Sequence, residues 1–372
     1  MTLKEIIAKS KLSPVQLGKS IKSLKSITES EAEFEVIKKE FIPEAQLERV
    51  TQIVAGLEQE DEFAILCRLM GTCQSMVGID QTPVIPNQDE TPPDFLATFA
   101  PGCSVVAKTS SDLGYQFKCF LEIKSCKDTS YKISRNALQR RINFAARYGL
   151  PLIFAIRLWS ESGAALWTMV SSDYLLSSNR RVDVSDMTAG VRHILLDDYF
   201  LMPIPNLHVA HYYDSQSKAL GIRHSEFGVQ IKTILLFRDF QYEILKKDLV
   251  FFSALFDSYQ PQEVQVKRDG NIAVQVLNVG IQGRSLADLL YTMNRLATDD
   301  QGHRIYDPSR FSSRFDSKEG KPTMITREMV EYYTSLHVQS QPVFMRLAFE
   351  EPEAQLKRLQ ELCARQLPQA DG

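Results

Sequence analysis

The chain has 372 residues, of which 44% are hydrophobic and 24% are charged, and its formal net charge is −3. This composition is typical of a globular protein with a sizeable core and excludes a polycation, so any nucleic-acid contact must depend on a local basic patch. No apolar run reaches the roughly 18 to 20 residues that cross a bilayer, and the first residues lack a signal-peptide core. We therefore expect a cytoplasmic protein that does not contact a membrane.

The six cysteines also bear on the compartment. They stand at positions 67, 73, 103, 119, 126 and 363. None of them forms a CxxC pair, and most lie in apolar surroundings, so the pattern predicts free thiols in a reducing compartment and favours neither a zinc site nor a disulfide framework.

Residues 1–56 predict a helical arm. Pro14 follows Ser13 at a typical helix start, and Pro43 interrupts the helical pattern before it resumes. Lys and Glu are mixed throughout the region, which is typical of helices that are solvated on one side.

Residues 57–205 predict a compact α/β unit. Apolar spacing predicts a helix over 58–78, in which Glu62 lies near the buried stripe. The elements expected after it are strands at 94–100 and 117–125, a helix over 134–149 that ends at Gly149, a buried strand at 151–159 and a strand at 164–175.

Residues 206–372 predict a separate α+β module. Asp269-Gly270 lies between alternating stretches and predicts a β-hairpin, while residues 231–257 are helical or mixed. Amphipathic helices are expected at 285–297 and 353–367. We interpret this half as an accessory domain for recognition, dimerisation or binding of a further protein partner.

Three charged positions in the α/β unit suggest a common chemistry. Glu122 and Lys124 are two residues apart in a strand and therefore point to the same face, and an adjacent antiparallel strand would place Asp94 beside Glu122. Two close carboxylates repel each other unless a cation lies between them, and oxygen ligands suit Mg²⁺. A nearby Lys can orient a water or stabilise a phosphoryl transition state. The set predicts hydrolysis of a phosphodiester.

Pro93-Asp94 followed by Glu122-x-Lys124 resembles the signature of the PD-(D/E)XK nuclease superfamily, which has the restriction-endonuclease-like fold. The stretch 121–158 is similar to archaeal Holliday-junction resolvases, and the resemblance extends over about residues 57–175. It implies a mixed sheet flanked by helices. It also implies Mg²⁺, for which Mn²⁺ can substitute, held by Asp94, Glu122 and the backbone carbonyl of Ile123, with Lys124 acting on the attacking water.

The resemblance implies two further site positions. Many members add a Glu from the preceding helix, for which Glu62 is the first choice and Glu58 the second. Some members place a polar residue on the following helix, where this chain has Gln139.

A basic stretch supports a nucleic-acid partner. Eight Lys or Arg residues between 118 and 147 are opposed by Glu122 and Asp128 alone. We expect phosphate contacts from Lys127, Lys132, Arg135, Gln139, Arg140 and Arg141. DNA is the expected substrate and RNA the alternative.

Two departures from the resolvases favour a restriction or defence-type endonuclease. Asp94 and Glu122 are separated by 27 residues, room for an inserted loop at 101–116, and the C-terminal half is foreign to those small enzymes. A homodimer is expected by analogy, because cutting both strands of a duplex needs two sites. Two alternatives stay open. One is a catalytically inactive member that binds nucleic acid or protein, and the other is an unrelated domain in which Glu122 and Lys124 form a surface ion pair.

Overall fold

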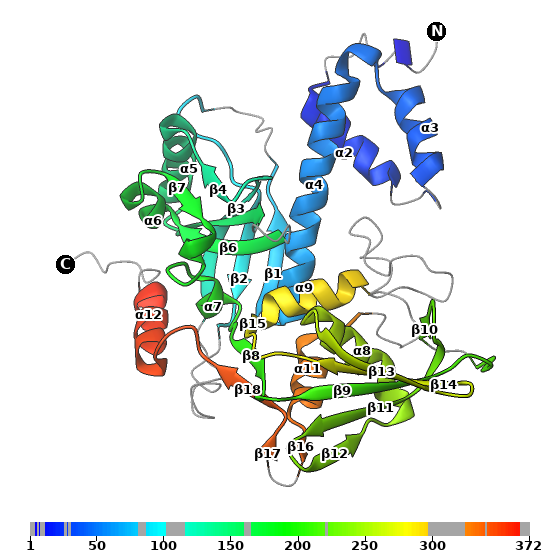
Figure 1. Cartoon of the computed structure of the whole chain (residues 1–372). Coiled ribbons are helices and arrows are strands. Elements are labelled where there is room, and N and C mark those ends of the chain that lie inside the picture. Colours follow the sequence, from blue (N-terminus) through cyan, green and yellow to red (C-terminus); the bar gives the residue numbers. More distant parts are fainter. Residues whose placement is uncertain are drawn as a thin grey trace.

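The computed structural model describes residues 4–5, 7, 12–25, 28, 31–80, 87–101, 116–159, 165–219, 222–296, 324–338 and 341–364. Over these residues the protein is a mixed α/β structure with an N-terminal group of helices and two main sheets (Figure 1). Among the described helices, none is long and apolar enough to span a bilayer.

The N-terminal arm is helical, as predicted. It comprises α2 (Pro14–Lys25), α3 (Glu31–Phe41) and the first half of α4 (Glu44–Met70). Its small core contains Leu17, Ile21, Phe34, Ile42, Val50 and Val54. Because α4 continues without a break into the next unit, the predicted boundary after residue 56 falls inside a helix, and the arm is joined to the sheet by a rigid element.

The first sheet has the strand order β1-β2-β3-β5-β6. Its strands are β1 (Cys73–Gly78), β2 (Phe95–Phe99), β3 (Phe117–Ser125), β5 (Leu152–Trp159) and β6 (Ala165–Ser171). Only the β3–β5 pair is parallel among these neighbours. The helix between these two strands, α5 (Arg135–Arg147), makes the crossover that parallel strands require.

Two expectations for this unit were wrong in part. The helix predicted over 58–78 ends at Met70, because Gly71 adopts a left-handed conformation (φ 77°) and its N–H donates to the Cys67 carbonyl. Residues 73–78 then form the edge strand β1. The strand predicted over 164–175 ends at Ser171, whose hydroxyl accepts the Tyr174 N–H and begins α6 (Ser172–Ser177). The strands expected near 94–100, 117–125 and 151–159 are confirmed.

Helices cover both faces of this sheet. α4 packs on the face that carries Cys119, Leu121 and Ile123. α5 packs on the other face, where Leu138 and Ala145 join Phe120, Phe154, Ile156 and Val170. Glu122 and Lys124 alternate with Leu121 and Ile123 along β3, so their side chains project toward the α5 side.

A short two-stranded ribbon lies beyond the end of β3. It consists of β4 (Ser130–Lys132) and β7 (Arg181–Asp183), which pair antiparallel. The 3-10 helix η1 (Val184–Met187) and the short helix α7 (Arg192–Leu195) follow β7.

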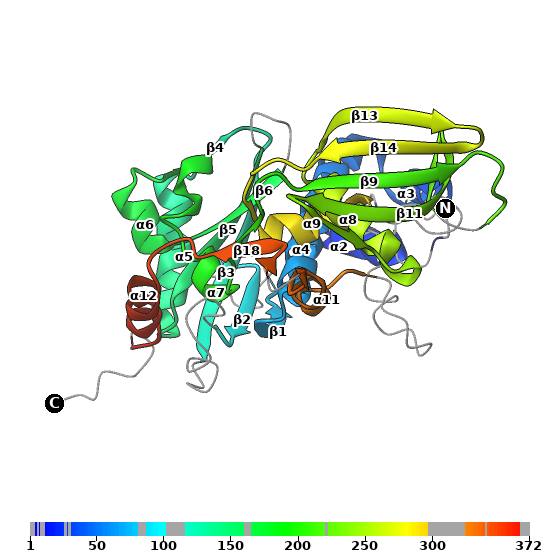
Figure 2. The same cartoon turned by 60° about the horizontal axis from the view of Figure 1, so that its bottom comes forward.

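The second sheet forms the C-terminal half and lies over α8 and α9 (Figure 2). Its order is β10-β11-β9-β14-β13, with β12 paired to β11. The strands are β9 (His208–Asp214), β10 (Arg223–His224), β11 (Gly228–Phe237), β12 (Phe240–Glu243), β13 (Gln262–Asp269) and β14 (Ile272–Asn278). The predicted hairpin is confirmed, and Gly270 (φ 56°) supplies its turn.

The two halves share one hydrophobic core, contrary to the expectation of a separate module. A continuous cluster of buried side chains extends from Phe63 in α4 to Phe344 in β18. β8 (Phe200–Pro203) pairs with both β15 (Arg284–Ser285) and β18 (Phe344–Leu347). The remaining elements are η2 (Lys246–Asp248), α8 (Leu249–Ser258), α9 (Leu286–Leu296), α11 (Arg327–Thr334), β16 (His337–Val338), β17 (Gln341–Pro342) and α12 (Pro352–Ala364).

Candidate active site

Asp94, Glu122 and Lys124 lie together at the β2–β3 pair. The antiparallel register sets Phe95 opposite Leu121, which brings Asp94, the residue before β2, level with Glu122. The Ile123 N–H donates to Asp94 Oδ2 at 2.6 Å, so the backbone of β3 holds the carboxylate in place. Asp94 is 6% exposed and Glu122 is fully buried. Two carboxylates are therefore held side by side away from bulk water.

Lys124 is the charge that bridges these groups. Its Nζ forms an ion pair with Glu122, lies 4.0 Å from Asp94 Oδ2 and donates to the Ile123 carbonyl at 2.9 Å. Burial alone would lower the pKa of the ammonium, but the charges of Glu122 and Asp94 outweigh burial and raise the pKa. Lys124 is thus charged at neutral pH, and its side chain retains 27% exposure.

Glu122 has a second cationic neighbour, Arg141 of α5. Arg141 Nε lies 2.6 Å from Glu122 Oε1. Even so, neither carboxylate oxygen of Glu122 has a partner in hydrogen-bond geometry. Burial raises the pKa of Glu122, Asp94 also raises it, and Lys124 and Arg141 act to lower it. A buried carboxylate with unused acceptor capacity is what a bound cation or water would satisfy.

The donor atoms fit a hard divalent cation. In the described parts of the chain, no three His, Cys, Asp or Glu side chains gather closely enough to hold a metal by themselves. Two carboxylates and the Ile123 carbonyl would supply three oxygen atoms, and Mg²⁺ completes such a small set with water. The Lys124 ammonium contacts or approaches all three oxygen donors. A cation would therefore need this ammonium to move aside.

A third acidic residue faces the site, and it is Glu60, which was not among the predicted site residues. The pKa of Glu60 is raised to about 8: burial is the largest cause and Asp94 adds to it, while Lys22 and Lys124 act to lower it. Glu60 is therefore close enough to Asp94 and Lys124 to sense their charges. It lies on α4, the helix that precedes the motif strands, so it occupies the place for which Glu62 and Glu58 were considered.

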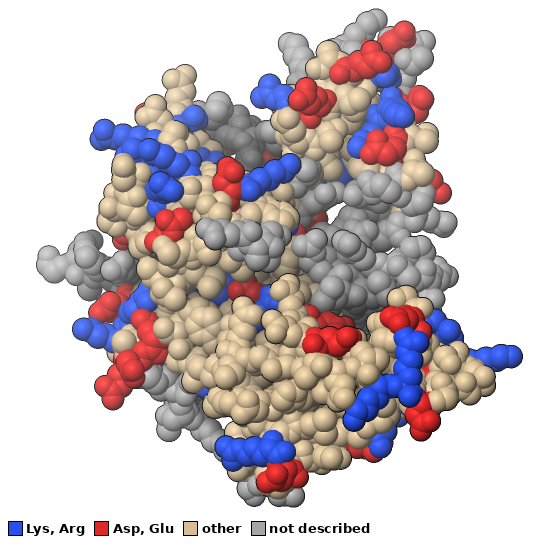
Figure 3. Space-filling view, viewed as in Figure 1, with Lys and Arg blue, Asp and Glu red and all other residues tan. Residues whose placement is uncertain are grey.

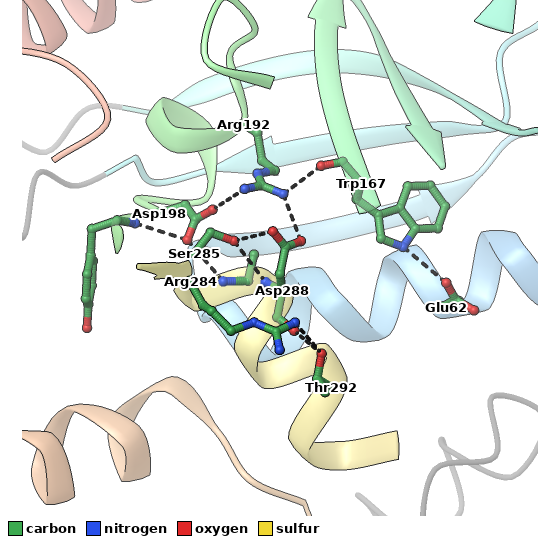
Figure 4. A network of polar contacts seen from close by, with 10 residues as sticks. Glu62, Trp167, Arg192, Asp198, Arg284, Ser285, Asp288 and Thr292 are labelled. Carbon is green, nitrogen blue, oxygen red and sulfur yellow. Dashed lines mark hydrogen bonds and ion pairs between the residues drawn. The ribbon is translucent and has the colours of Figure 1, made fainter. Parts of the chain in front are cut away.

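The structure does not bring Glu62 to Asp94 and Glu122, where the sequence analysis expected a catalytic glutamate from α4. Glu62 Oε1 accepts from the Trp167 indole N–H at 3.1 Å (Figure 4). The same oxygen lies 2.9 Å from Arg157 Nε. Trp167 on β6 is paired with Arg157 on β5. Both side chains lie on the face of the sheet opposite the one that carries Glu122. The side chain of Glu58 lies outside the described residues.

Arg157 connects this buried pair to the C-terminal half. Its Nη2 donates to the hydroxyl of Tyr291 on α9 at 3.3 Å. Glu62 is therefore an anchor between α4, the sheet and α9. Residues two apart in a helix are turned by about 200°, which is why Glu60 and Glu62 face different surroundings.

Of the six residues predicted to bind nucleic acid, three are engaged within the protein. Arg141 pairs with Glu122 and donates to the Ala137 carbonyl. Arg140 donates to the Glu90 carbonyl at 3.1 Å, although it remains exposed. Gln139 donates to Asn143 on the exposed side of α5 and is turned away from the Arg141 face. The Arg140 contact, with those from Asn143 to the Asp89 carbonyl and from the Thr91 N–H to the Arg140 carbonyl, docks α5 on the segment that leads to Asp94.

The other three predicted residues, Lys127, Lys132 and Arg135, are exposed. Figure 3 shows Lys and Arg side chains gathered over the region where Figure 1 has α5, α6 and β7. Sequence reasoning missed Arg181, which joins them from β7 through the pairing of Lys132 with Arg181. It also missed Tyr131 as a neighbour of the site. Tyr131 lies beside the site, since Lys124, Glu122 and Arg141 all affect its pKa, which burial raises.

The thiol expectation is confirmed where the structure describes it. Cys67, Cys73, Cys119 and Cys126 are free. Cys103 and the side chain of Cys363 lie outside the described residues.

No protein-family model matches the sequence, and no curated protein matches it. Among solved structures, the chain is similar to the Holliday junction resolvase Hjc of the archaeal hyperthermophile Archaeoglobus fulgidus. That match has a TM-score of 0.26 and 17% identity, and it covers 36% of this chain and 93% of the resolvase chain. Because a TM-score this low carries no argument, the function is inferred from the residues of this chain.

Proposed function

We propose that this protein is a metal-dependent endonuclease with a restriction-endonuclease-like core, which hydrolyses phosphodiester bonds of DNA. The observation that carries the proposal is the convergence of Asp94, Glu122 and the Ile123 carbonyl on the Lys124 ammonium. Ordinary surface ion pairs lie in water, whereas Glu122 is fully buried and neither of its oxygens has a hydrogen-bond partner. A buried ion pair is costly, and buried charges with perturbed pKa values cluster at functional sites.

In this mechanism Asp94, Glu122 and the Ile123 carbonyl would hold Mg²⁺ or Mn²⁺, which would supply Lewis-acid chemistry for phosphodiester hydrolysis. The Lys124 ammonium moves off Glu122 and orients the attacking water or stabilises charge on the phosphoryl oxygens. Water adds to phosphorus as the bond to the 3′-oxygen breaks, and the 3′-oxygen takes a proton. The products are a 5′-phosphate and a 3′-hydroxyl.

Duplex cleavage requires two such sites, so the proposal includes a homodimer. The C-terminal half is assigned to recognition of a target, of a second copy or of a further protein, as in a restriction or defence-type enzyme. RNA remains the alternative substrate, because the proposed site acts on the phosphodiester group, which DNA and RNA share, and no surface is assigned to base recognition.

A specific observation favours a second candidate, a catalytically inactive nucleic-acid-binding module. Glu122 already has two cationic neighbours, Lys124 and Arg141. Together they can neutralise the carboxylate pair without any metal. In this alternative the ion pairs only stabilise the end of β3.

Cleavage of supercoiled plasmid separates the two candidates. The native protein is incubated with Mg²⁺ or Mn²⁺ and compared with Asp94→Asn and Lys124→Ala, and Lys246→Ala serves as an exposed control outside the site. The endonuclease predicts metal-dependent nicking or linearisation that is lost in both site variants and kept in the control. DNA binding without cleavage by the native protein would favour the inactive module. Cleavage that survives Asp94→Asn would overturn the assigned site.

Direct metal binding gives an independent test. Calorimetric titration with Mn²⁺ is expected to show binding to the native protein and a loss of at least about tenfold in affinity in Asp94→Asn, since one of two carboxylate ligands becomes neutral. Equal affinities in the two proteins would mean that Asp94 is not a ligand.

A further inference from the structure

The β4–β7 ribbon sets two cations directly against each other. Lys132 on β4 is paired with Arg181 on β7, and both side chains are exposed. Like charges at directly opposed positions destabilise an antiparallel pair. The middle pair of the ribbon, Tyr131 and Val182, packs into the core, so Lys132 and Arg181 lie on its other, exposed side.

Arg135 adds a third positive charge at the same place. It is the first residue of α5, and the Ile133 N–H just before it donates to the carbonyl of Arg180, the neighbour of Arg181. The first turn of α5 contains no acidic residue. A cation at the N-terminal end of a helix is unfavourable, because the helix dipole places positive charge there.

The nearby carboxylates do not neutralise this group. Asp183 Oδ1 accepts from the backbone N–H of Ser185, and Asp186 accepts from the Tyr174 hydroxyl. Arg181 contributes to the lowered pKa of Asp183, after the hydrogen bonds with Ser185 and against the effect of burial, so the two charges do interact. In the described part of the chain, however, neither Lys132 nor Arg135 nor Arg181 forms an ion pair with a carboxylate.

The ribbon borders the candidate active site. Cys126, two residues after Lys124, donates from its thiol to the carbonyl of Ser130 on β4 at 3.4 Å. An extended polyanion that places one phosphate at Lys124 would therefore pass along the ribbon with its neighbouring phosphates.

We propose that Lys132, Arg135 and Arg181 form a phosphate-binding surface, the ribbon surface, which holds the nucleic-acid backbone beside the scissile bond. The inference rests on the proposed function and assigns it a binding residue, Arg181, that lies far along the chain from the motif. The occupant is a phosphodiester backbone, since three exposed cations beside a phosphodiesterase site match repeated phosphates.

The test measures binding and its salt dependence. Fluorescence anisotropy follows a short fluorescein-labelled DNA duplex, in EDTA to prevent cleavage, with the native protein and Lys132→Ala/Arg181→Ala. Losing two phosphate contacts is expected to weaken binding about tenfold or more and to reduce the slope of log affinity against log salt by about 2. The control, Lys246→Ala/Lys247→Ala, makes the same change in net charge at exposed positions on η2 and is expected to bind like the native protein.

Folding and substrate class are resolved in the same experiment. Because the substitutions remove a like-charge pair, the double variant is expected to have a melting temperature equal to or above that of the native protein. If the double variant bound more weakly and also melted at a lower temperature, the single variants Lys132→Gln and Arg181→Gln would be tested. Each would have to show a reduced salt slope with an unchanged melting temperature. Single variants that keep the native salt slope would overturn the inference. A duplex RNA of the same sequence shows which backbone the surface prefers.

The outcomes separate the two proposals. If the native protein binds and cleaves DNA but the double variant binds equally well, the ribbon surface is wrong and the endonuclease stands. An equal loss in the Lys246/Lys247 control would mean that net charge alone acts, which also overturns the ribbon surface. If the native protein neither cleaves plasmid nor binds either duplex, both proposals are wrong.

Discussion

Two buried charge clusters in this protein are opposites of each other. In one, the anion Glu122 lies between the cations Lys124 and Arg141. In the other, the cation Arg192 lies between the anions Asp198 and Asp288, at 2.9 Å and 3.1 Å (Figure 4). Glu122 and Arg192 are both fully buried. The two clusters therefore share burial and charge balance, and they differ in their backbone contacts and in the exposure of one charged side chain.

The Arg192 cluster is sealed by the backbone. Arg192 Nη1 donates to the Trp167 carbonyl at 2.7 Å, and Asp198 Oδ1 accepts the N–H groups of Tyr199 and Ala287. Asp288 accepts from the Ser285 hydroxyl at the start of α9. These contacts join α7, β6 and α9, which belong to the two halves of the chain.

The Glu122 cluster has less support from the backbone. Both clusters contain buried polar atoms without a hydrogen-bond partner, among them Glu122 Oε2 and Asp198 Oδ2. The Glu122 carboxylate accepts no backbone N–H, however, and the Lys124 side chain retains 27% exposure, whereas Arg192 and Asp198 are fully buried. The comparison teaches that a buried ion pair is structural when backbone groups hold it and its charged side chains are all buried, and is available for chemistry when the backbone leaves the carboxylate free and one charged side chain can reach solvent.

The largest effect expected from this comparison follows from removing Arg192. Arg192→Met leaves Asp198 and Asp288 buried without their cation, and such breaks cost about 3–5 kcal/mol of unfolding free energy. Urea denaturation compares the variant with Arg223→Met, an exposed arginine that is expected to change stability by less than about 0.5 kcal/mol. A loss below about 1 kcal/mol in Arg192→Met would show that the cluster is not a structural bond between the halves.

The opposite profile is expected at Glu122. Glu122→Gln removes a proposed metal ligand and should lower the rate of plasmid cleavage by about 10²–10³-fold, equivalent to about 3–4 kcal/mol in activation free energy. Its unfolding free energy should change by less than about 1 kcal/mol, because Lys124 can turn to solvent and an amide avoids burying a charge. Large destabilisation with full cleavage would reverse the roles assigned to the two clusters.

A smaller effect distinguishes the two glutamates of α4. Glu62→Gln weakens the contacts with Trp167 and Arg157, and we expect a loss of about 1–3 kcal/mol in stability, as for a hydrogen bond to a charged group. Cleavage at a temperature well below the melting transition should be largely retained. Glu60→Gln is the matched variant, expected to reduce cleavage and preserve stability. If Glu62→Gln lost cleavage and Glu60→Gln retained it, the glutamate of α4 that acts in cleavage would be Glu62 and not Glu60.

Sequence reasoning located the motif strand well because its signals are local. Alternation along 117–125 gives β3 and places Glu122 and Lys124 on one face, and the serine cap and Gly149 delimit α5. The sequence did not indicate which side of α4 faces the motif. That helix buries Phe63, Ile65, Leu66, Cys67, Leu69 and Met70, which cover about 200° of its circumference, because both the sheet and the C-terminal half contact it. So broad an apolar face does not indicate which of the neighbouring acidic residues lies near Asp94.

Long-range pairing was equally out of reach. The partner of Glu122 on α5, the opposition of Lys132 and Arg181, and the bond from Arg157 to Tyr291 each join residues that only the tertiary fold brings together. The shared core of the two halves has the same origin. Each half has its own sheet and helices, and the sequence pattern of either would fit an independent domain.

The smallest effect is a pH dependence that should belong to the open cluster. Burial raises the pKa of Glu60 from 4.5 to about 8, so between these values the folded state binds more protons than the unfolded chain, and stability falls as pH rises. In EDTA, the native protein should therefore lose more unfolding free energy between pH 6.5 and 8 than Glu60→Gln does. In the sealed cluster, burial raises the pKa of Asp198 only to about 6, so Asp198→Asn should follow the native slope in that window. Identical slopes for the native protein and Glu60→Gln would place Glu60 in water, away from the site.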